Sequence, residues 1–157
     1  MKYITKVEVR GYKGVGAGSG FIKWFTFSLN EVTHVSIVFY FSDGQVVEIE
    51  AIQGKGVIIH RPTVGKEFIV RVADLSEQQS WEAYQLAQSL IGSDYDWKGI
   101  WGFVRRKKKH DEFKWFCSEL VAYILWRVGL PLSRRKPFQE TPATVTDSLV
   151  LSLPKDC

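Results

Sequence analysis

Apolar and polar residues alternate along much of the first half of the chain, a pattern typical of β-strands. In the run 33–41 almost all odd-numbered positions are apolar, and in the run 45–51 the odd positions are again apolar, as Val47, Ile49 and Ala51. Ser42-Asp43-Gly44 lies between the two runs and has the composition of a tight turn. The pattern therefore predicts a β-hairpin that buries its odd-numbered side chains.

Shorter runs extend this β-rich half. Residues 3–12 alternate well enough to predict an edge strand, and residues 56–60 and 68–72 predict two more strands, with Pro62 interrupting. The glycine-rich stretch 11–20 has neither the G-x-G-x-x-G pattern nor the Lys-Ser/Thr ending of a phosphate loop, so it gives no support for nucleotide binding. It instead predicts a tight turn into a short helix over residues 21–27.

The second half of the chain has helical periodicity. Ser76 and Gln79 have capping-box spacing at the start of a helix that Gly92 ends. The residues that we expect to share its apolar face are Trp81, Tyr84, Ala87 and Ile91. Residues 95–99 predict a second helical or turn segment.

Two further helices are expected near the end of the chain. Residues 117–128 are strongly apolar and stop at Gly129, just before Pro131. Thr141-Pro142 has the form of a cap followed by a first-turn proline, which predicts a last short helix. Strands followed by helices, with no repeat and no linker, indicate one α+β domain over residues 1–157.

Composition limits the class of protein. Of the 157 residues, 45% are hydrophobic and 24% are charged, which is ordinary for a soluble globular protein. No run approaches the ~18 apolar residues of a membrane span, and the start of the chain lacks the apolar stretch of a signal peptide. We therefore expect synthesis in the cytoplasm, with release or delivery by another route if the protein acts elsewhere.

Neither a disulfide framework nor a metal site is indicated. The two cysteines, Cys117 and Cys157, allow only one pair in a chain of this size. His34, His60 and His110 are isolated in sequence and lack the spacing of zinc ligands. We expect neither a metal nor another cofactor.

Positive charge is concentrated in one segment. From Lys98 to Lys136 there are 11 Lys or Arg residues and three acids, about +8, which leaves about −4 for the remainder of a chain whose net charge is +4. Its densest part is Arg105, Arg106, Lys107, Lys108 and Lys109. This run is interpreted either as a simple solvated loop or as a site for an anionic polymer or membrane surface. No specific recognition of nucleic acid is expected.

Cys117 is a candidate nucleophile because it stands where an apolar helix is predicted to begin. Thiolate is the reactive form of cysteine, and the N-terminus of a helix favours negative charge. The backbone N–H groups of the first turn would also stabilise an oxyanion. The alternative interpretation is that Cys117 is a small buried core residue, the commonest role of a free cysteine.

The predicted hairpin supplies a base and an acid. Burying the odd-numbered side chains puts His34, Glu48 and Glu50 together on the other face. A three-residue turn places His34 opposite Ile52, with Glu50 as its diagonal neighbour, within reach of the imidazole. Glu50 is thus the first choice for an acid that orients His34, and Glu48 is the second. The alternative for His34 is a surface histidine on the solvent side of the sheet.

Four segments occur in an order that resembles a known family. They are Thr33-His34-Val35-Ser36-Ile37-Val38, Val47-Glu48-Ile49-Glu50-Ala51, Tyr95-Asp96-Trp97 and Trp115-Phe116-Cys117-Ser118-Glu119-Leu120-Val121. Together with Thr141-Pro142 they resemble the circularly permuted branch of the NlpC/P60 papain-like superfamily, the YaeF/YiiX-like amidases, in which the histidine strand precedes the cysteine helix. The resemblance spans about Gly18 to Leu149.

The resemblance implies a permuted papain-like fold, an antiparallel β-sheet or barrel packed against helices. It also implies Cys117 as nucleophile, His34 as general base, Glu50 as orienting acid and Tyr95 as a substrate-lining residue. The chain departs from the family pattern at Ser36, where glycine is expected and where a side chain would narrow the cleft. The basic insertion at residues 105–110 is a second departure.

The expected function is cysteine-dependent hydrolysis of an amide bond, in a small peptide or a cell-wall-type substrate, through an acyl-enzyme. Two alternatives remain open. One is a thioesterase or acyltransferase acting on lipid or acyl substrates, because permuted relatives include such enzymes. The other is a non-catalytic module that binds an anionic polymer through the basic segment, and this alternative predicts steep salt dependence.

Overall fold

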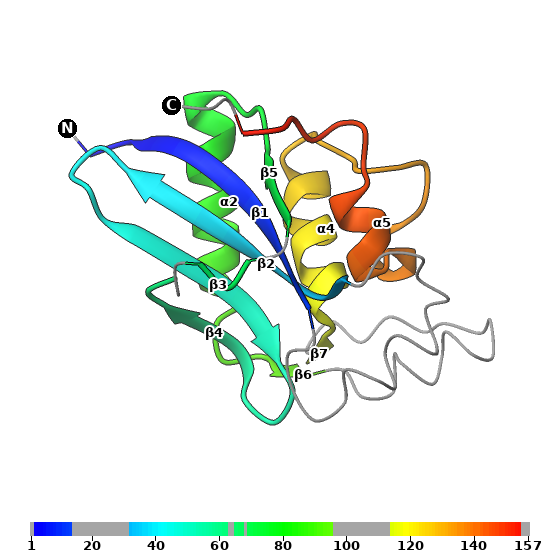
Figure 1. Cartoon of the computed structure of the whole chain (residues 1–157). Coiled ribbons are helices and arrows are strands. Elements are labelled where there is room, and N and C mark those ends of the chain that lie inside the picture. The colour runs from blue at the N-terminus through cyan, green and yellow to red at the C-terminus, as the bar shows by residue number, and fades with distance from the viewer. Residues whose placement is uncertain (1, 14–31, 63–64, 68, 96–113, 155–157) are drawn as a thin grey trace.

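The fold is α+β, with one open antiparallel sheet packed against helices (Figure 1). The computed structural model describes residues 2–13, 32–62, 65–67, 69–95 and 114–154. Five strands form the sheet in the order β4-β3-β2-β1-β5. Their bounds are β1 Ile4–Lys13, β2 Val32–Phe41, β3 Val46–Ile52, β4 Gly56–His60 and β5 Ile69–Val72.

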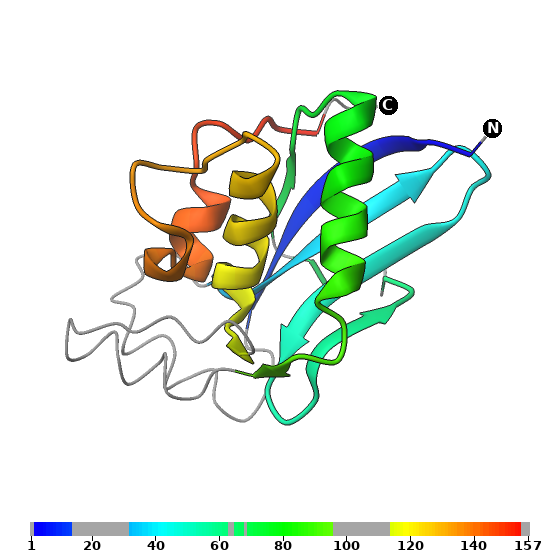
Figure 2. The same cartoon turned by 180° about the vertical axis from the view of Figure 1, so that it is seen from behind.

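The described residues also form three α-helices and one 3₁₀ helix. They are α2 Glu77–Ser89, α4 Cys117–Arg127, η1 Pro137–Gln139 and α5 Pro142–Thr146. α2 packs on β1 and on α4, and α4 packs on β2 and β3. Figure 2 shows α2 and α4 side by side over one face of the sheet, with α5 beyond α4. No helix within the described residues is long and apolar enough to cross a membrane.

The hairpin forms with the predicted register. β2 and β3 pair antiparallel from Ile37–Ile49 to Tyr40–Val46, and the amide of Phe41 donates to the carbonyl of Gln45 at 2.9 Å. Residues 42–44 make the turn, in which Gly44 has a φ of 84°, a conformation that favours glycine. Continuing this register places His34 opposite Ile52, which confirms the expected placement of His34 and Glu50 as diagonal neighbours.

The strand at the start of the chain is not the edge strand that the sequence predicts. β1 lies between β2 and β5, and its pairing with β5 runs from Glu8–Val72 to Gly11–Ile69. Local alternation predicts a strand but carries no signal for a partner about sixty residues away. The edges of the sheet are β4 and β5.

The first described helix begins as predicted, but only part of the expected face is buried: Ala87 is fully buried and Tyr84 packs against the core, whereas Trp81 and Ile91 are exposed. Ser76 and Gln79 form the capping box. The buried residues of α2 are small ones, Ser80, Ala83 and Ala87, whereas Trp81 is 39% exposed and Ile91, beyond the helix, is 38% exposed. Small residues at the contact let the helix backbone approach its neighbours closely, and this packing overrides the preference of large apolar side chains for burial.

Residues 94–95 form a strand where the sequence predicts a helical or turn segment from Tyr95. β6 (Asp94–Tyr95) pairs in parallel with β7 (Lys114–Trp115). The partner strand comes from a later part of the chain, so local pattern alone does not reveal it. Residues 96–99 and the short helix expected at 21–27 lie outside the described residues.

The remaining two helices agree with the prediction at their starts. α4 begins at Cys117, and Gly129, two residues past its end, has a φ of 87°. Thr141 caps α5 with its side chain, and Pro142 is the first residue of that helix. α5 packs closely on β1, because a Cβ added at Gly11 would lie 2.9 Å from a methyl group of Thr146. Glycine at position 11 allows this approach.

Both faces of the hairpin are buried. The odd-numbered residues Val35, Ile37, Phe39 and Ile49 are fully buried in the main core. The even-numbered polar side chains on the other face are also enclosed, with exposed fractions of 0–9% for Ser36, Glu48, Glu50 and His34. The interpretation of His34 as a solvent-exposed surface histidine is therefore wrong. We call this second face the polar face of the sheet.

Candidate functional site

Cys117 is the first residue of α4 and is fully buried, with 0% of its surface exposed. The N-cap residue, Phe116, makes no capping hydrogen bond with its side chain. Ser118, the residue after Cys117, holds the first turn in place by donating a hydrogen bond of 2.6 Å to the carbonyl of Glu140. The sulfur therefore lies at the positive end of the helix and is enclosed by protein.

His34 joins this cysteine to an acid. Its Nε2 forms a hydrogen bond with Oε2 of Glu50, and Cys117 lies close enough to the ring to raise its pKa. Because Nε2 is engaged with Glu50, Nδ1 is the ring nitrogen left for the sulfur. The structure thus brings together three residues that are separated by up to 83 positions in sequence (117 − 34 = 83).

The surroundings of His34 favour the imidazolium ion. Burial disfavours a charged ring, but the charge and hydrogen bond of Cys117, together with those of Glu50, outweigh burial and raise the pKa of His34 to about 10. A histidine in this state holds its proton at neutral pH.

Glu50 accepts hydrogen bonds from two histidines. Oε2 faces His34, and Oε1 faces Nε2 of His60, the last residue of β4. Burial opposes the charge of Glu50, but the hydrogen bonds and charges of the two imidazoles lower its pKa below the ordinary value. We refer to Cys117, His34, Glu50 and His60 as the histidine cluster.

His60 is the member of this cluster that sequence reasoning missed. In the sequence it is an isolated histidine at the end of a short alternating run. Its register opposite Glu48 puts it on the polar face, diagonal to Glu50. The sequence does carry one signal for His60, its even-numbered position in the strand that follows the hairpin. Placing His60 next to Glu50 from this signal also requires the β3–β4 register, which the sequence does not specify.

Glu48 has a different set of contacts from Glu50. Its Oε1 accepts hydrogen bonds from the hydroxyls of Tyr12 and Ser36. The structure therefore brings the first-choice acid, and not the second, into hydrogen-bond contact with His34. Ser36, a departure from the family pattern, is fully buried and is a partner of Glu48. The Tyr12 ring lies beside His34, with ring centroids 6.0 Å apart.

Two other predicted positions are only partly described. The backbone of Tyr95 lies in β6, next to Trp115 of β7, two residues before Cys117. Its role in lining a substrate site stays a prediction. The basic run of residues 105–109, predicted to meet an anionic polymer or membrane surface, lies outside the described residues.

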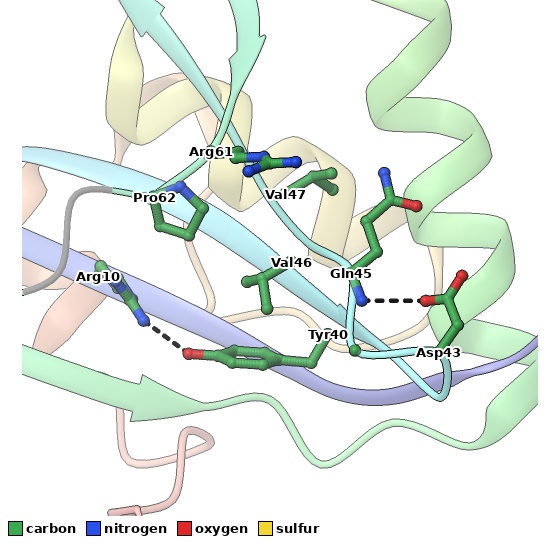
Figure 3. Close-up of a pocket in the computed structure, with 9 residues that line it drawn as sticks. Arg10, Tyr40, Asp43, Gln45, Val46, Val47, Arg61 and Pro62 are labelled. Atoms are coloured by element: carbon green, nitrogen blue, oxygen red, sulfur yellow. Dashed lines mark hydrogen bonds between the residues drawn. The ribbon is translucent and has the colours of Figure 1, made fainter.

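Two cavities lie apart from the histidine cluster. One, of about 620 Å³, is at the turn end of the hairpin, where Arg10, Tyr40, Gln45, Arg61 and Pro62 are among its lining residues (Figure 3). The other, of about 460 Å³, lies against α4 and the segment that follows it. Neither is lined by Cys117, His34, Glu50 or His60.

The second cavity combines aromatic rings with positive charge. The rings come from Trp115, Tyr123, Trp126 and Phe138, and the basic residues are Arg134, Arg135 and Lys136. Trp126 is 51% exposed. Cys117 faces the core, whereas Tyr123 and Trp126 project from the opposite side of α4, since they lie six and nine residues later at 100° per residue. We call this cavity the aromatic pocket.

The described residues contain no group of three or more His, Cys, Asp or Glu placed to hold a metal ion. Both oxygens of Glu50 are already used by imidazoles. Comparison of the chain with the profiles of known protein families and with curated proteins found no match.

Proposed function

We propose that this protein is a cysteine-dependent hydrolase that cleaves an amide bond through an acyl-enzyme. The observation that supports it best is that one buried imidazole, His34, forms a hydrogen bond with the carboxylate of Glu50 and lies close enough to Cys117 for that residue to raise its pKa. Nucleophile, base and orienting acid in this order are the parts of a catalytic triad, which is recognised by geometry and not by sequence position.

Each residue has a role that follows from its chemistry. The thiolate of Cys117 attacks the carbonyl carbon of the substrate, and the imidazolium of His34 gives its proton to the leaving amine as the C–N bond breaks. Neutral His34 then takes a proton from water, which attacks the thioester and releases the acid and the free thiolate. Glu50 keeps the His34 ring oriented and stabilises its charge. The backbone N–H groups at the start of α4 would stabilise the oxyanion.

The proposal includes the permuted papain-like fold. A histidine strand that precedes the cysteine helix, and an antiparallel sheet packed on that helix, are consistent with the resemblance of residues 33–38, 47–51 and 115–121 to the circularly permuted NlpC/P60 branch. The implied substrates are small peptides or cell-wall-type amides.

The pH profile of thiol alkylation tests the thiol–imidazole pairing without knowledge of the substrate. The measurement is the rate of iodoacetamide labelling of Cys117 between about pH 5 and pH 10, in a Cys157→Ser background that leaves a single thiol. A free thiol titrates near pH 8.5. We expect native Cys117 to retain its labelling rate well below this pH and His34→Ala to lose that advantage.

Two controls make the result interpretable. Because Cys117 is fully buried, the absolute rate includes a step that uncovers the sulfur, so the shape of the profile is the readout. The urea-unfolded chain supplies the profile of the same thiol without its partners. Superimposable profiles for the native protein and for His34→Ala would reject the pairing.

A second candidate function, thioester or ester hydrolysis or acyl transfer on an amphiphilic substrate, is favoured by the aromatic pocket. Its volume of about 460 Å³ lies in the range of small-molecule sites, and its rings and three basic residues would suit an acyl chain that carries an anionic group. The pocket lies on the side of α4 away from the sulfur. It would therefore dock such a molecule and not hold the bond to be cleaved.

The two chemistries differ in the leaving group, so paired substrates separate them. Turnover of a p-nitroanilide peptide is compared with turnover of an acyl thioester, each with native protein and with Trp126→Ala. The amidase proposal expects turnover of the anilide with little effect of Trp126→Ala. Turnover of the thioester alone, with KM raised by Trp126→Ala, would favour the second candidate. The non-catalytic alternative expects neither reaction and salt-sensitive binding of an anionic polymer such as heparin.

A further inference from the structure

His60 makes two hydrogen bonds, and both partners are acceptors. Nδ1 lies 2.8 Å from the backbone carbonyl oxygen of Arg61, and Nε2 contacts Oε1 of Glu50. A carbonyl oxygen only accepts, and an ionised carboxylate only accepts. A neutral imidazole has one N–H and one lone pair, so it satisfies only one of these contacts. The two contacts are satisfied together when His60 is an imidazolium.

The electrostatic surroundings of His60 agree with this assignment. Burial opposes a charged ring, but the hydrogen bonds to Arg61 and Glu50, together with the negative charges of Glu50 and Glu48, outweigh it and raise the pKa of His60 above 6.5. Both acids come from β3, the strand that pairs with β4, and Glu48 lies directly opposite His60 in the register. His60 is thus held as a cation against an acidic strand.

The sheet explains why one carboxylate serves both rings. Glu50 sits on β3 between β2 and β4, opposite Ile58. It is diagonal to His34 on one neighbouring strand and to His60 on the other, the separation over which long side chains meet on one face of a sheet. Each carboxylate oxygen bonds one ring, so rotating the carboxylate to improve one contact would break the other.

We propose that His60 is a positioning residue of the site, which fixes the Glu50 carboxylate so that its other oxygen stays on His34. This inference rests on the proposed function for its catalytic consequence. When Cys117 is a thiolate and His34 an imidazolium, the four members of the histidine cluster carry alternating charges that sum to zero. Removing His60 leaves the same buried groups with a net charge of −1, which a low-dielectric interior disfavours.

A double-mutant cycle at Cys117 separates this role from a merely structural one. Labelling rates at pH 7 are measured for His60→Ala, Glu50→Ala and the double variant, all in the Cys157→Ser background. We expect His60→Ala to slow labelling about 5- to 30-fold and to have less than about a twofold further effect once Glu50 is absent. If instead the two losses multiply, His60 does not act through Glu50 and the inference fails.

Two further variants support the cycle. His60→Gln retains an amide N–H that reaches Glu50, and we expect it to keep more of the labelling rate than His60→Ala; an equal loss in both would overturn the role as an anchor. Ile59→Ala is the matched control, because Ile59 is the neighbouring residue of β4, points to the other face and is 38% exposed. Its labelling profile should match that of the native protein.

The inference and the proposed function fail in different ways. Equal profiles for native protein and His34→Ala reject the thiol–imidazole pairing. The state of His60 is tested separately by NMR titration of histidine ring carbons, where we expect its midpoint above 6.5 in the native protein and a lower midpoint in Glu50→Gln. A midpoint unchanged by Glu50→Gln would reject the contact between His60 and Glu50, whatever the reaction of Cys117.

Discussion

Two polar clusters lie on the same face of one sheet, yet they differ in how their charges respond to pH. The charged cluster, at the turn end of the hairpin, consists of Lys6, Glu8, Arg10 and Tyr40. Glu8 is the shared acceptor: Arg10 donates to it at 3.2 Å, the Tyr40 hydroxyl donates at 2.8 Å, and Lys6 pairs with it at 2.7 Å. Arg10 also donates to the Tyr40 hydroxyl at 2.6 Å. The histidine cluster lies where β2 begins and β4 ends.

The charged cluster keeps one set of charges over the whole neutral range. Although burial opposes the charge of Glu8, its bonds to Lys6 and Tyr40 and the nearby cations lower its pKa, and the pKa of Tyr40 is raised to about 12 by burial and by Glu8. The histidine cluster holds two imidazoles and a thiol, the side chains that titrate nearest neutrality. Both clusters therefore bury charge on this face, but only the histidine cluster has exchangeable protons beside the proposed nucleophile, Cys117.

Removing the proposed nucleophile, Cys117, should have the largest effect on activity. Cys117→Ser should lower turnover of whichever probe substrate the native protein hydrolyses by about 10⁴-fold or more, because the hydroxyl is a far weaker nucleophile than the thiolate. Turnover is measured in steady state, with circular dichroism to confirm the fold. Cys157→Ser is the matched control and should retain activity; retained turnover in Cys117→Ser would move the chemistry to another residue.

Removing the proposed base, His34, should have the next largest effect. His34→Gln keeps a hydrogen-bonding side chain but cannot carry a proton to the leaving group, so we expect kcat/KM to fall about 10²- to 10⁴-fold. The pH–rate profile should also flatten, because the group that titrates is gone. A variant that keeps the native pH profile would show that His34 does not act as the acid and base.

Breaking the charged cluster should affect stability and not thiol chemistry. Arg10→Met leaves the buried Glu8 carboxylate without its arginine, and we expect the free energy of unfolding in urea to fall by about 3 kcal/mol. Arg61→Met, an exposed arginine that lines the same cavity, should change it by less than about 0.5 kcal/mol. The pH profile of Cys117 labelling should be native in both; an altered profile in Arg10→Met would mean that the two clusters are coupled.

The smallest expected effect is the pH dependence that Glu50 gives to stability. Its native pKa is below 4.5, so its contribution is present above pH 4.5 and is lost as the pH falls through the native value. The native pKa of His60 is above 6.5, so its contribution is full below 6.5 and is lost as the pH rises through the native value. Stability of the native protein relative to Glu50→Gln should therefore be greatest between about pH 4.5 and 6.5, by about 2 kcal/mol.

Urea unfolding at several pH values measures this difference. Glu50 raises the pKa of His34 as well as that of His60, so the upper limb of the curve contains the loss of both histidine contacts. A difference that is flat from pH 3 to pH 8 would show that neither histidine bond to Glu50 contributes to the unfolding free energy.

The sequence alone determined the elements whose signals are local. Period-two alternation around Ser42-Asp43-Gly44 specified the hairpin and its register, and with it the pairing of His34 with Glu50 over Glu48. Capping residues specified the starts of α2 and α5, and an apolar run that stops at Gly129 specified α4. These features depend on residues that are only a few positions apart. A short segment of the sequence is therefore enough to predict them.

Only the tertiary structure decided which distant segments meet. It made β1 an interior strand through β5, enclosed the polar face that alternation alone would leave to solvent, and brought His60 onto Glu50 from a third strand. It also brought the thiol of Cys117 to the imidazole of His34. Such contacts arise because the whole core is packed at once, and the choice among partners depends on the combined burial of all segments and not on the pattern of any one.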